Sequence, residues 1–226
     1  MRTSHVVNIA LVIVGFSVQV FARPMDIRSP NLEPARNGKP RPPIVVPVSA
    51  TNLLSLGCGV TSSAVPLLGE LSYVTDGSKE HDDPYVELPG GSQWVQIDLG
   101  QTQEVWAVCI WHWYEYACVY HDVICQISND RDFIDGVATV FNNDHDNSSR
   151  LGAGADKEYI ETNEGRTFAI KDVKGRYLRF YSRENTEKAT SRYTEIEVFG
   201  RRPVQSQPAD EPLVPLKVEL PKPIFM

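Results

Sequence analysis

The sequence has no surplus of positive charge, and it lacks the short motifs that mark common chemistry. Its 226 residues contain 22 Lys and Arg against 29 Asp and Glu, so the net charge is −7. That balance argues against a protein that binds nucleic acid through the phosphate backbone, because such binding needs a basic footprint. No C-x-x-C, G-x-S-x-G, H-E-x-x-H or Gly-rich phosphate loop is present. The chain therefore carries no local signature of a zinc ribbon, a thiol redox site or a common class of enzyme.

Proline is scarce in the middle of the chain. Of 16 prolines, only three lie within residues 51–200, and this stretch holds all four Trp and all nine Tyr. Seven prolines lie in residues 23–50 and six in residues 201–226. We therefore expect one aromatic-rich domain over 51–200, between a Pro-rich linker (23–50) and a Pro-rich C-terminal tail (201–226), both extended.

A long apolar run is also missing. The run from Val6 to Phe21 is shorter than the roughly 20 residues that a transmembrane helix needs. It follows Arg2 and ends in Val20-Phe21-Ala22, which is typical of a secretory signal cleaved near Ala22. We therefore expect residues 1–22 to be a signal peptide, and the protein to be secreted or periplasmic (cell envelope) with no transmembrane anchor.

Cysteine is limited to four residues, Cys58, Cys109, Cys118 and Cys125. Export would place them where disulfides form, and four cysteines allow three complete pairings among which the sequence does not choose. Cys109 and Cys125 lie inside apolar, strand-like runs, where a free cysteine behaves as a small hydrophobic residue. Disulfides and free thiols both remain open.

What the middle of the chain does contain is the pattern of β-strands. Trp94 to Leu99 alternates apolar and polar residues, the period of a half-buried strand, and no stretch of ten residues keeps a helical period. The strands predicted are Trp94–Leu99, Glu104–Tyr114, Asp122–Ser128, Val137–Asn142, Glu158–Thr162, Arg166–Lys171, Arg176–Arg183 and Thr194–Phe199. Short strands at this spacing predict an all-β sandwich or barrel. Val95, Ile97 and Leu99 share one face, and we expect Trp94 and Leu99 to be buried determinants of the fold.

Four landmarks in this region resemble a known family. They are Asn52-Leu-Leu…Val60-Thr-Ser-Ser63, Thr75-Asp-Gly77, Gln93-Trp-Val-Gln-Ile-Asp-Leu-Gly100 and Tyr193-Thr-Glu-Ile-Glu-Val-Phe-Gly200. Together they resemble a discoidin, or coagulation factor type C, domain of the galactose-binding-like superfamily, of an exported bacterial type. The resemblance covers residues 51–200. It implies a jelly-roll β-sandwich with chain ends close together and binding loops at one end. It also implies a module that binds glycans, lipid headgroups or proteins and catalyses nothing itself.

The resemblance also implies a structural calcium ion. Many such sandwiches hold Ca²⁺ between the Asp-Gly loop and the first Glu of the last strand, which here are Asp76 and Glu195. Ser78, Lys79 or Thr194 would lend backbone oxygens to the six to eight that calcium requires. Without the resemblance, two glutamates on one strand face are usually solvated. The loop Asp-Gly-Ser-Lys-Glu also departs from the commoner pattern, in which an acid or amide follows the glycine closely.

Two other groups of polar residues are weaker candidates for metal sites. Asp144 and Asp146 have EF-hand spacing, but Ser149 and Ala155 occupy the positions of the required Gly and Glu, so we expect a turn capped by Asx side chains. His112, Glu115 and His121 lack the H-x-H pair of a cupin, which argues against a transition-metal enzyme.

The best candidate ligand surface is the aromatic stretch from His112 to Tyr116, with Tyr120 nearby and the end of another strand at residues 183–185. Sugars pack their C–H faces on aromatic rings while their hydroxyl groups take directed hydrogen bonds. The candidate ligand-binding residues are His112, Trp113, Tyr114, Tyr116, Arg183 and Asn185. The alternative is that these aromatic residues pack inside the sandwich, which is the interpretation we favour for Trp111.

The function predicted is a secreted, non-catalytic module that binds carbohydrate. Two alternatives stay open: a protein-interaction or structural module of the cell envelope, and a small extracellular glycan-active enzyme. The C-terminal segment 212–225 is apolar, and its prolines exclude a helix. It is either a frayed tail or an extended edge strand that docks on its own sandwich or on a protein partner.

Overall fold

The computed structural model describes residues 29–36, 39–202 and 211–223, and the predicted signal peptide lies outside this range. The described chain is built of ten strands and two short 3₁₀ helices. The strands are β1 (Val45–Pro47), β2 (Asn52–Leu53), β3 (Gly59–Ser62), β4 (Val86–Leu88), β5 (Gln93–His112), β6 (Ile124–Ser128), β7 (Ala138–Asn142), β8 (Arg166–Ser182), β9 (Ser191–Arg201) and β10 (Leu213–Pro215). The helices are η1 (Val48–Ala50) and η2 (Leu71–Thr75). No helix in the described ranges is long and apolar enough to cross a membrane.

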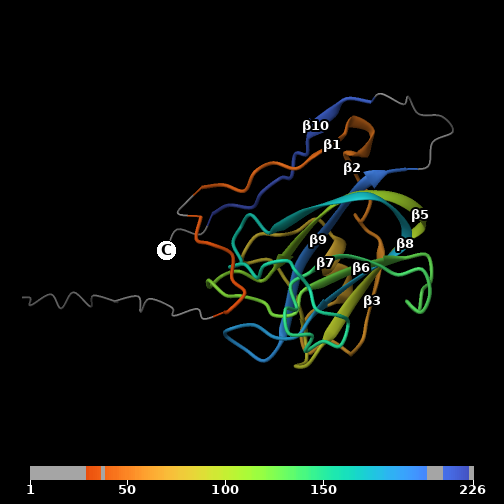
Figure 1. Cartoon of the computed structure of the whole chain (residues 1–226). Coiled ribbons are helices and arrows are strands. Elements are labelled where there is room, and N and C mark those ends of the chain that lie inside the picture. The colour runs from red at the N-terminus through yellow and green to blue at the C-terminus, as the bar shows by residue number, and fades with distance from the viewer. Residues whose placement is uncertain (1–28, 37–38, 203–210, 224–226) are drawn as a thin grey trace, which may run out of the picture.

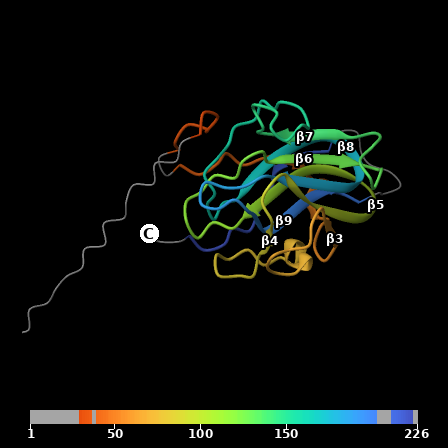
Figure 2. The ribbon, with the colours of Figure 1, turned by 90° about the horizontal axis from the view of Figure 1, so that it is seen from below.

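The strands form an antiparallel sandwich, so the prediction of an all-β fold is confirmed (Figures 1 and 2). The main sheet has the order β2-β9-β5-β8-β6-β7, with β3 paired to β5 and β4 paired to β9. The first half of β5 pairs with β3 and with the second half of β8. The second half of β5 pairs with β9 and with the first half of β8. The two long strands therefore contribute to both halves of the sheet.

This course of β5 corrects the predicted strand list. Two pairs of predicted strands are fused, one pair into β5 and one into β8. Gly100 sits in β5 at φ +78°, a conformation that favours glycine, and the pairing register shifts between Asp98 and Gln103. The glycine thus marks a bend where the sequence pattern indicated an end. The predicted strand Glu158–Thr162 is wrong, since this segment makes only isolated bridges, Glu158 to Leu32 and Ile160 to Val119.

The core confirms the predicted faces of residues 94–99 but corrects one residue. Val95, Ile97 and Leu99 are buried in the main apolar cluster, and Leu99 keeps only 7% of its surface exposed. Trp94 is half-buried instead of buried, and the Arg179 guanidinium lies over its ring at 4.2 Å. Strand alternation places Trp94 on the outer face, so it is not a core determinant of the fold.

The Pro-rich flanks, expected to be extended linkers, pair with each other in part. β1 of the N-terminal flank and β10 of the C-terminal flank form an antiparallel two-stranded sheet, and the two flanks run side by side in Figure 1. The pairing continues with Leu216 N–H donating to Ile44 C=O at 2.7 Å. Further along, Val218 packs against Cys109, Trp111 and Tyr114 on the outside of the sandwich. The docked alternative for the tail is therefore confirmed for these residues, and the surface on which it docks belongs to its own chain.

The flanks account for an unusual feature of the main sheet, which is apolar on both faces along β5. Trp111 and Cys109 alternate with core residues along β5 and are themselves fully buried, because Val218 of the C-terminal flank packs on them.

All four cysteines are free thiols, and Cys109, Cys118 and Cys125 are packed in apolar surroundings. Of the two alternatives for the cysteines, the structure shows free thiols.

Candidate functional site

Three loops join at one end of the sandwich. The loop after β5 and the loop before β9 are linked by backbone hydrogen bonds from His121 N–H to Glu184 C=O (2.9 Å) and from Arg183 N–H to His121 C=O (3.0 Å). The loop before β8 is attached through Glu161 N–H, which donates to Cys118 C=O at 2.8 Å. These bonds hold the loops together as one surface, so the side chains on it have defined positions.

An aromatic cluster lies on this loop surface. Tyr116 is 49% exposed, and its ring meets the ring of Trp113 edge-on with centroids 5.6 Å apart. Trp113 is 8% exposed and also contacts Tyr85 at 5.8 Å. The Arg192 guanidinium lies over the Trp113 ring at 4.6 Å. A buried cation thus stacks on Trp113, and Tyr116 is the ring that faces solvent.

Arg192 is an unusual residue in this cluster because it is 2% exposed and its Nε has no hydrogen-bond partner among the described residues. Its ion-pair contacts are long, 3.6 Å from Nε to Glu87 and 3.9 Å from Nη1 to Glu187. The guanidinium is therefore neutralised by two carboxylates without being held tightly by either, and its closest ring contact is with Trp113.

His112 lies inside the sandwich and not on the ligand surface. It is fully buried, stacks on Tyr120 at 4.2 Å, and its Nδ1 is 2.7 Å from Glu161 Oε1. Glu161 is also fully buried, and desolvation raises the pKa of its carboxyl despite the histidine partner. The alternative of core packing therefore holds for His112 and Tyr120, whereas Trp111 is buried on the outer face of the sheet, where Val218 of the C-terminal tail packs.

The remaining predicted ligand residues are dispersed. The Tyr114 hydroxyl donates to Lys79 C=O at 2.8 Å, and the Tyr114 side chain is 4% exposed. The Asn185 side chain closes the turn before β9: its oxygen accepts from two backbone N–H groups and its amide donates to Thr190 C=O. Arg183 pairs with Asp122 (3.2 Å) and Glu184 (3.2 Å). Of the six predicted residues, Trp113 and Tyr116 are in contact on the loop surface.

Three aspartates could hold a metal ion. Asp122, Asp144 and Asp146 each offer a carboxylate oxygen, and these oxygens lie within 4.8 Å of one another. The predicted Asx-capped turn is confirmed here, since Asp144 accepts the backbone N–H groups of Ser148 (3.0 Å) and Ser149 (2.9 Å). Desolvation and the neighbouring Asp144 raise the pKa of Asp122. Asp122 was not among the predicted metal ligands, because it lies 22 positions before Asp144 in the chain.

The residues of the implied calcium site lie together at η2 and β9. Glu195 is fully buried, its Oε2 accepts Gly77 N–H at 3.2 Å, and its Oε1 has no partner among the described residues. Desolvation, with the nearby charges of Glu197 and Asp76, raises the pKa of Glu195 to about 9. Asp76 is exposed and accepts Ser78 N–H at 2.8 Å.

The neighbouring cation is Lys79, whose ammonium pairs with Glu197 and lies over the Trp111 ring at 4.9 Å. Thr194 is buried, with a hydroxyl that lacks a partner among the described residues.

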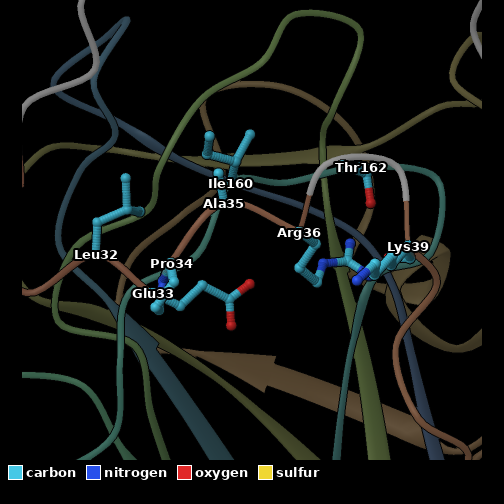
Figure 3. Close-up of a pocket in the computed structure, with 8 residues that line it drawn as sticks. All are labelled: Leu32, Glu33, Pro34, Ala35, Arg36, Lys39, Ile160 and Thr162. Atoms are coloured by element: carbon cyan, nitrogen blue, oxygen red, sulfur yellow. The ribbon is translucent and has the colours of Figure 1, made fainter.

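A cavity lies elsewhere, between the N-terminal flank and the loop before β8 (Figure 3). It has a volume of about 280 Å³, and apolar side chains such as Leu32 and Ile160 form part of its wall. Two of its charged residues are already paired: Glu33 with Arg41 and Arg166, and Arg36 with Glu164. We therefore do not place the functional site there.

Tyr85, Arg192 and Glu187 were missed by the sequence analysis. Tyr85 lies directly before β4, whereas Glu187 and Arg192 lie in the loop before β9 and in β9 itself. Only the pairing of β4 with β9 brings these distant segments together. The one signal available was Arg192 itself, a cation two residues before the predicted strand Thr194–Phe199 and, in the structure, inside β9.

No protein-family model matches the sequence, and no curated protein matches it. Solved structures do. A family 89 glycoside hydrolase from Clostridium perfringens aligns with a TM-score of 0.52 and 19% identity, over 70% of this chain and 16% of that chain. A chitosan-binding module of a chitosanase/glucanase from Paenibacillus sp. IK-5 aligns with a TM-score of 0.47 and 22% identity, over 66% and 99%. The CBM32 of AlyQ, in complex with 4,5-unsaturated mannuronic acid, aligns with a TM-score of 0.46 and 20% identity, over 62% and 93%.

The likeness to the glycoside hydrolase, which is limited to a small part of that long enzyme, shows the fold of this chain. That fold is an antiparallel jelly-roll sandwich, which confirms the architecture that the four landmarks implied.

Proposed function

We propose that this protein is a secreted, non-catalytic carbohydrate-binding module, and that the glycan binds on the loop surface at Tyr116. The observation that carries the proposal is the solvent-facing ring of Tyr116, supported edge-on by Trp113. Trp113 is in turn held against the buried Arg192. A rigid, half-exposed ring on a loop surface is what a sugar needs for packing of its C–H face.

Acidic side chains beside the ring would take the directed hydrogen bonds of the sugar hydroxyls. Glu115 is exposed next to Tyr116, and the Glu187 side chain is 30% exposed beside Arg192. Carboxylates accept hydrogen bonds from hydroxyl groups and form stronger bonds than neutral acceptors do. The solved neighbours that bind chitosan or a mannuronic acid derivative are in keeping with this class of ligand.

The test is glycan binding by wild type and by Tyr116→Ala, first on a glycan array and then by calorimetry with the best ligand. We expect Tyr116→Ala to weaken binding about tenfold or more, because truncation of a central aromatic contact commonly has that effect. Leu213→Ala, which changes a residue that is 62% exposed on β10, is the matched control. Equal binding by wild type and Tyr116→Ala would place the ligand elsewhere. Turnover of the bound glycan would instead support the enzyme alternative.

The same proposal includes a structural calcium ion at Asp76 and Glu195. The residues fit such an ion, because the buried Glu195 Oε1 lacks a partner in the described part of the chain and Asp76 lies close enough to contribute to the raised pKa of Glu195. A divalent cation would satisfy both carboxylates, with backbone oxygens near Ser78 and Thr194 completing its shell. Calcium would stabilise the loop that carries Asp76, and a cation bound only to the folded state raises the melting temperature.

A further inference from the structure

A row of polar side chains crosses the outer face of the sheet, away from the loop surface. It takes one residue from each of five adjacent strands, because the register pairs them directly. The row consists of Thr61 (β3), Gln96 (β5), Arg179 (β8), Gln126 (β6) and Thr139 (β7). Their neighbours along the strands, such as Ile97 and Leu178, lie in the core, so alternation directs the row outward.

Arg179 is held rigidly at the centre of this polar row. Its guanidinium lies between the rings of Trp94 and Phe133, 4.2 Å from each centroid. Its Nε and Nη2 both donate to Gln96 Oε1, at 2.8 and 2.7 Å, and Nη2 also donates to Arg131 C=O at 3.2 Å. A stacked and hydrogen-bonded arginine is pre-organised, so little conformational entropy would be lost when a ligand binds beside it.

A groove of about 160 Å³ opens at the β3 side of the polar row. Gly59, Thr61 and Gln96 line it together with the exposed residue Arg131 and with Asp98, whose carboxylate is paired with Arg176. A Cβ atom placed on Gly59 would meet no atom within 4 Å, so the absence of a side chain there leaves the groove open.

Of the three arginines discussed on this face, one has a carboxylate partner and two have none among the described residues. Arg176 is paired with Asp98 at 2.7 Å. Arg179 and Arg131, however, have no carboxylate within ion-pair distance in the described part of the chain, and the partners of Arg179 are neutral oxygens. On a protein with a net charge of −7, two adjacent guanidinium groups without a close ion-pair partner in the described ranges favour an anionic ligand.

We infer that this sheet face is a second binding site, which takes an acidic polysaccharide lying across the strands. Five strands spaced about 4.8 Å apart extend the polar row over about 19 Å, which suits a chain and not a single sugar. Gln96 and Gln126 are buried and hydrogen-bonded within the row, so it is the exposed hydroxyl groups of Thr61 and Thr139 that can donate to and accept from sugar hydroxyls. Arg131 and Arg179 would pair with the uronate carboxylates. This site does not rest on the proposed loop surface.

The test uses the full chain and oligomers of galacturonate, of mannuronate and of hyaluronan, with methyl-esterified oligogalacturonate as the uncharged counterpart. We expect wild type to bind at least one of the acidic oligomers, with an affinity that falls as salt is added. Arg131→Ala should weaken this binding about tenfold through loss of one charge-assisted contact, and Arg131→Lys should retain most of it. Gly59→Leu should weaken it by filling the groove. Lys174→Ala, which removes an exposed positive charge elsewhere on β8, is the matched control.

The same oligomers are titrated against Tyr116→Ala to separate the two sites. Loss of acidic-oligomer binding in Tyr116→Ala, with none in Arg131→Ala or Gly59→Leu, would overturn the second site and leave the loop surface as the binder. Failure of wild type to bind any acidic oligomer would also overturn it, whatever neutral glycan the loop surface binds. Equal binding of the methyl ester would overturn the role assigned to the arginines.

Discussion

Replacement of Glu195 by Gln tests the chemistry of the buried carboxylate directly. Its pKa is raised from an ordinary 4.5 to about 9, with desolvation as the largest cause. A carboxyl whose pKa is raised by folding must be protonated in the folded state at pH values where the unfolded chain has released the proton. Its contribution to stability is therefore complete below about pH 4.5 and is lost as the pH rises towards 9. Each pH unit in that window costs about 1.4 kcal/mol, so the loss reaches a few kcal/mol near neutral pH.

Glutamine has the shape of the protonated acid and does not titrate. In chelator, we expect Glu195→Gln to be more stable than wild type above about pH 6, by a margin that grows with pH to a few kcal/mol. With calcium the order should reverse, because the ion binds the ionised carboxylate of wild type alone. Urea unfolding at a series of pH values, with chelator and with calcium, measures both effects. Glu219→Gln, on an exposed residue of the tail, is the control. Parallel stability curves for wild type and Glu195→Gln in chelator would refute the reasoning.

Three further outcomes follow from the packing. Leu99→Ala should lower the free energy of unfolding in urea by about 2–5 kcal/mol, because it leaves a cavity in the core. Trp94→Ala, on a half-buried residue, should lower it by about 1–2 kcal/mol, and equal losses would contradict the assigned faces. Leu216→Ala should speed amide hydrogen exchange in β1 and β10 while β5 stays protected, because Leu216 packs in the apolar cluster that joins the flanks to Ala107 and Phe199 of the sandwich. Unchanged exchange would show that this cluster does not hold β1 and β10 in place. In the native protein Cys109 and Cys118 should resist a thiol reagent until urea unfolds the chain, because burial raises the pKa of both thiols, that of Cys118 to about 12. Fast labelling of the native protein would show instead that the two thiols are accessible.

The sequence predicts the sandwich well because half-buried strands carry a local signal. The alternation in residues 94–99 places Val95, Ile97 and Leu99 on one face, as the structure confirms. The length of β5 could not be predicted in the same way. Gly100 and the turn-like residues after it resemble a strand end, and only pairing with β8 on both sides shows that the strand continues.

The candidate site was predicted less completely, because its residues meet only through tertiary contacts. Trp113 and Tyr116 are close in the sequence and were found, but Tyr85 and Arg192 lie in other segments. His112 was assigned to the ligand surface because it borders the aromatic stretch. In the structure it is the last inward-facing residue of β5, stacked on the ring of Tyr120 and tilted against the ring of Tyr193. A polar side chain in a core is hidden from pattern analysis when its partner, here Glu161, lies 49 positions away.

The pairing of β1 with β10 has a mechanical consequence. Val45 lies opposite Pro215 and Pro47 opposite Leu213, so both chain segments leave this ribbon at the same end. A force that pulled those two segments apart would load the hydrogen bonds of the ribbon one after another, beginning with the bond from Leu216 to Ile44. Bonds loaded singly yield at lower force than bonds loaded together. Once the flank segments beyond it had left the sandwich, the ribbon would therefore open from this end and lengthen the chain before β5 and β8 were loaded.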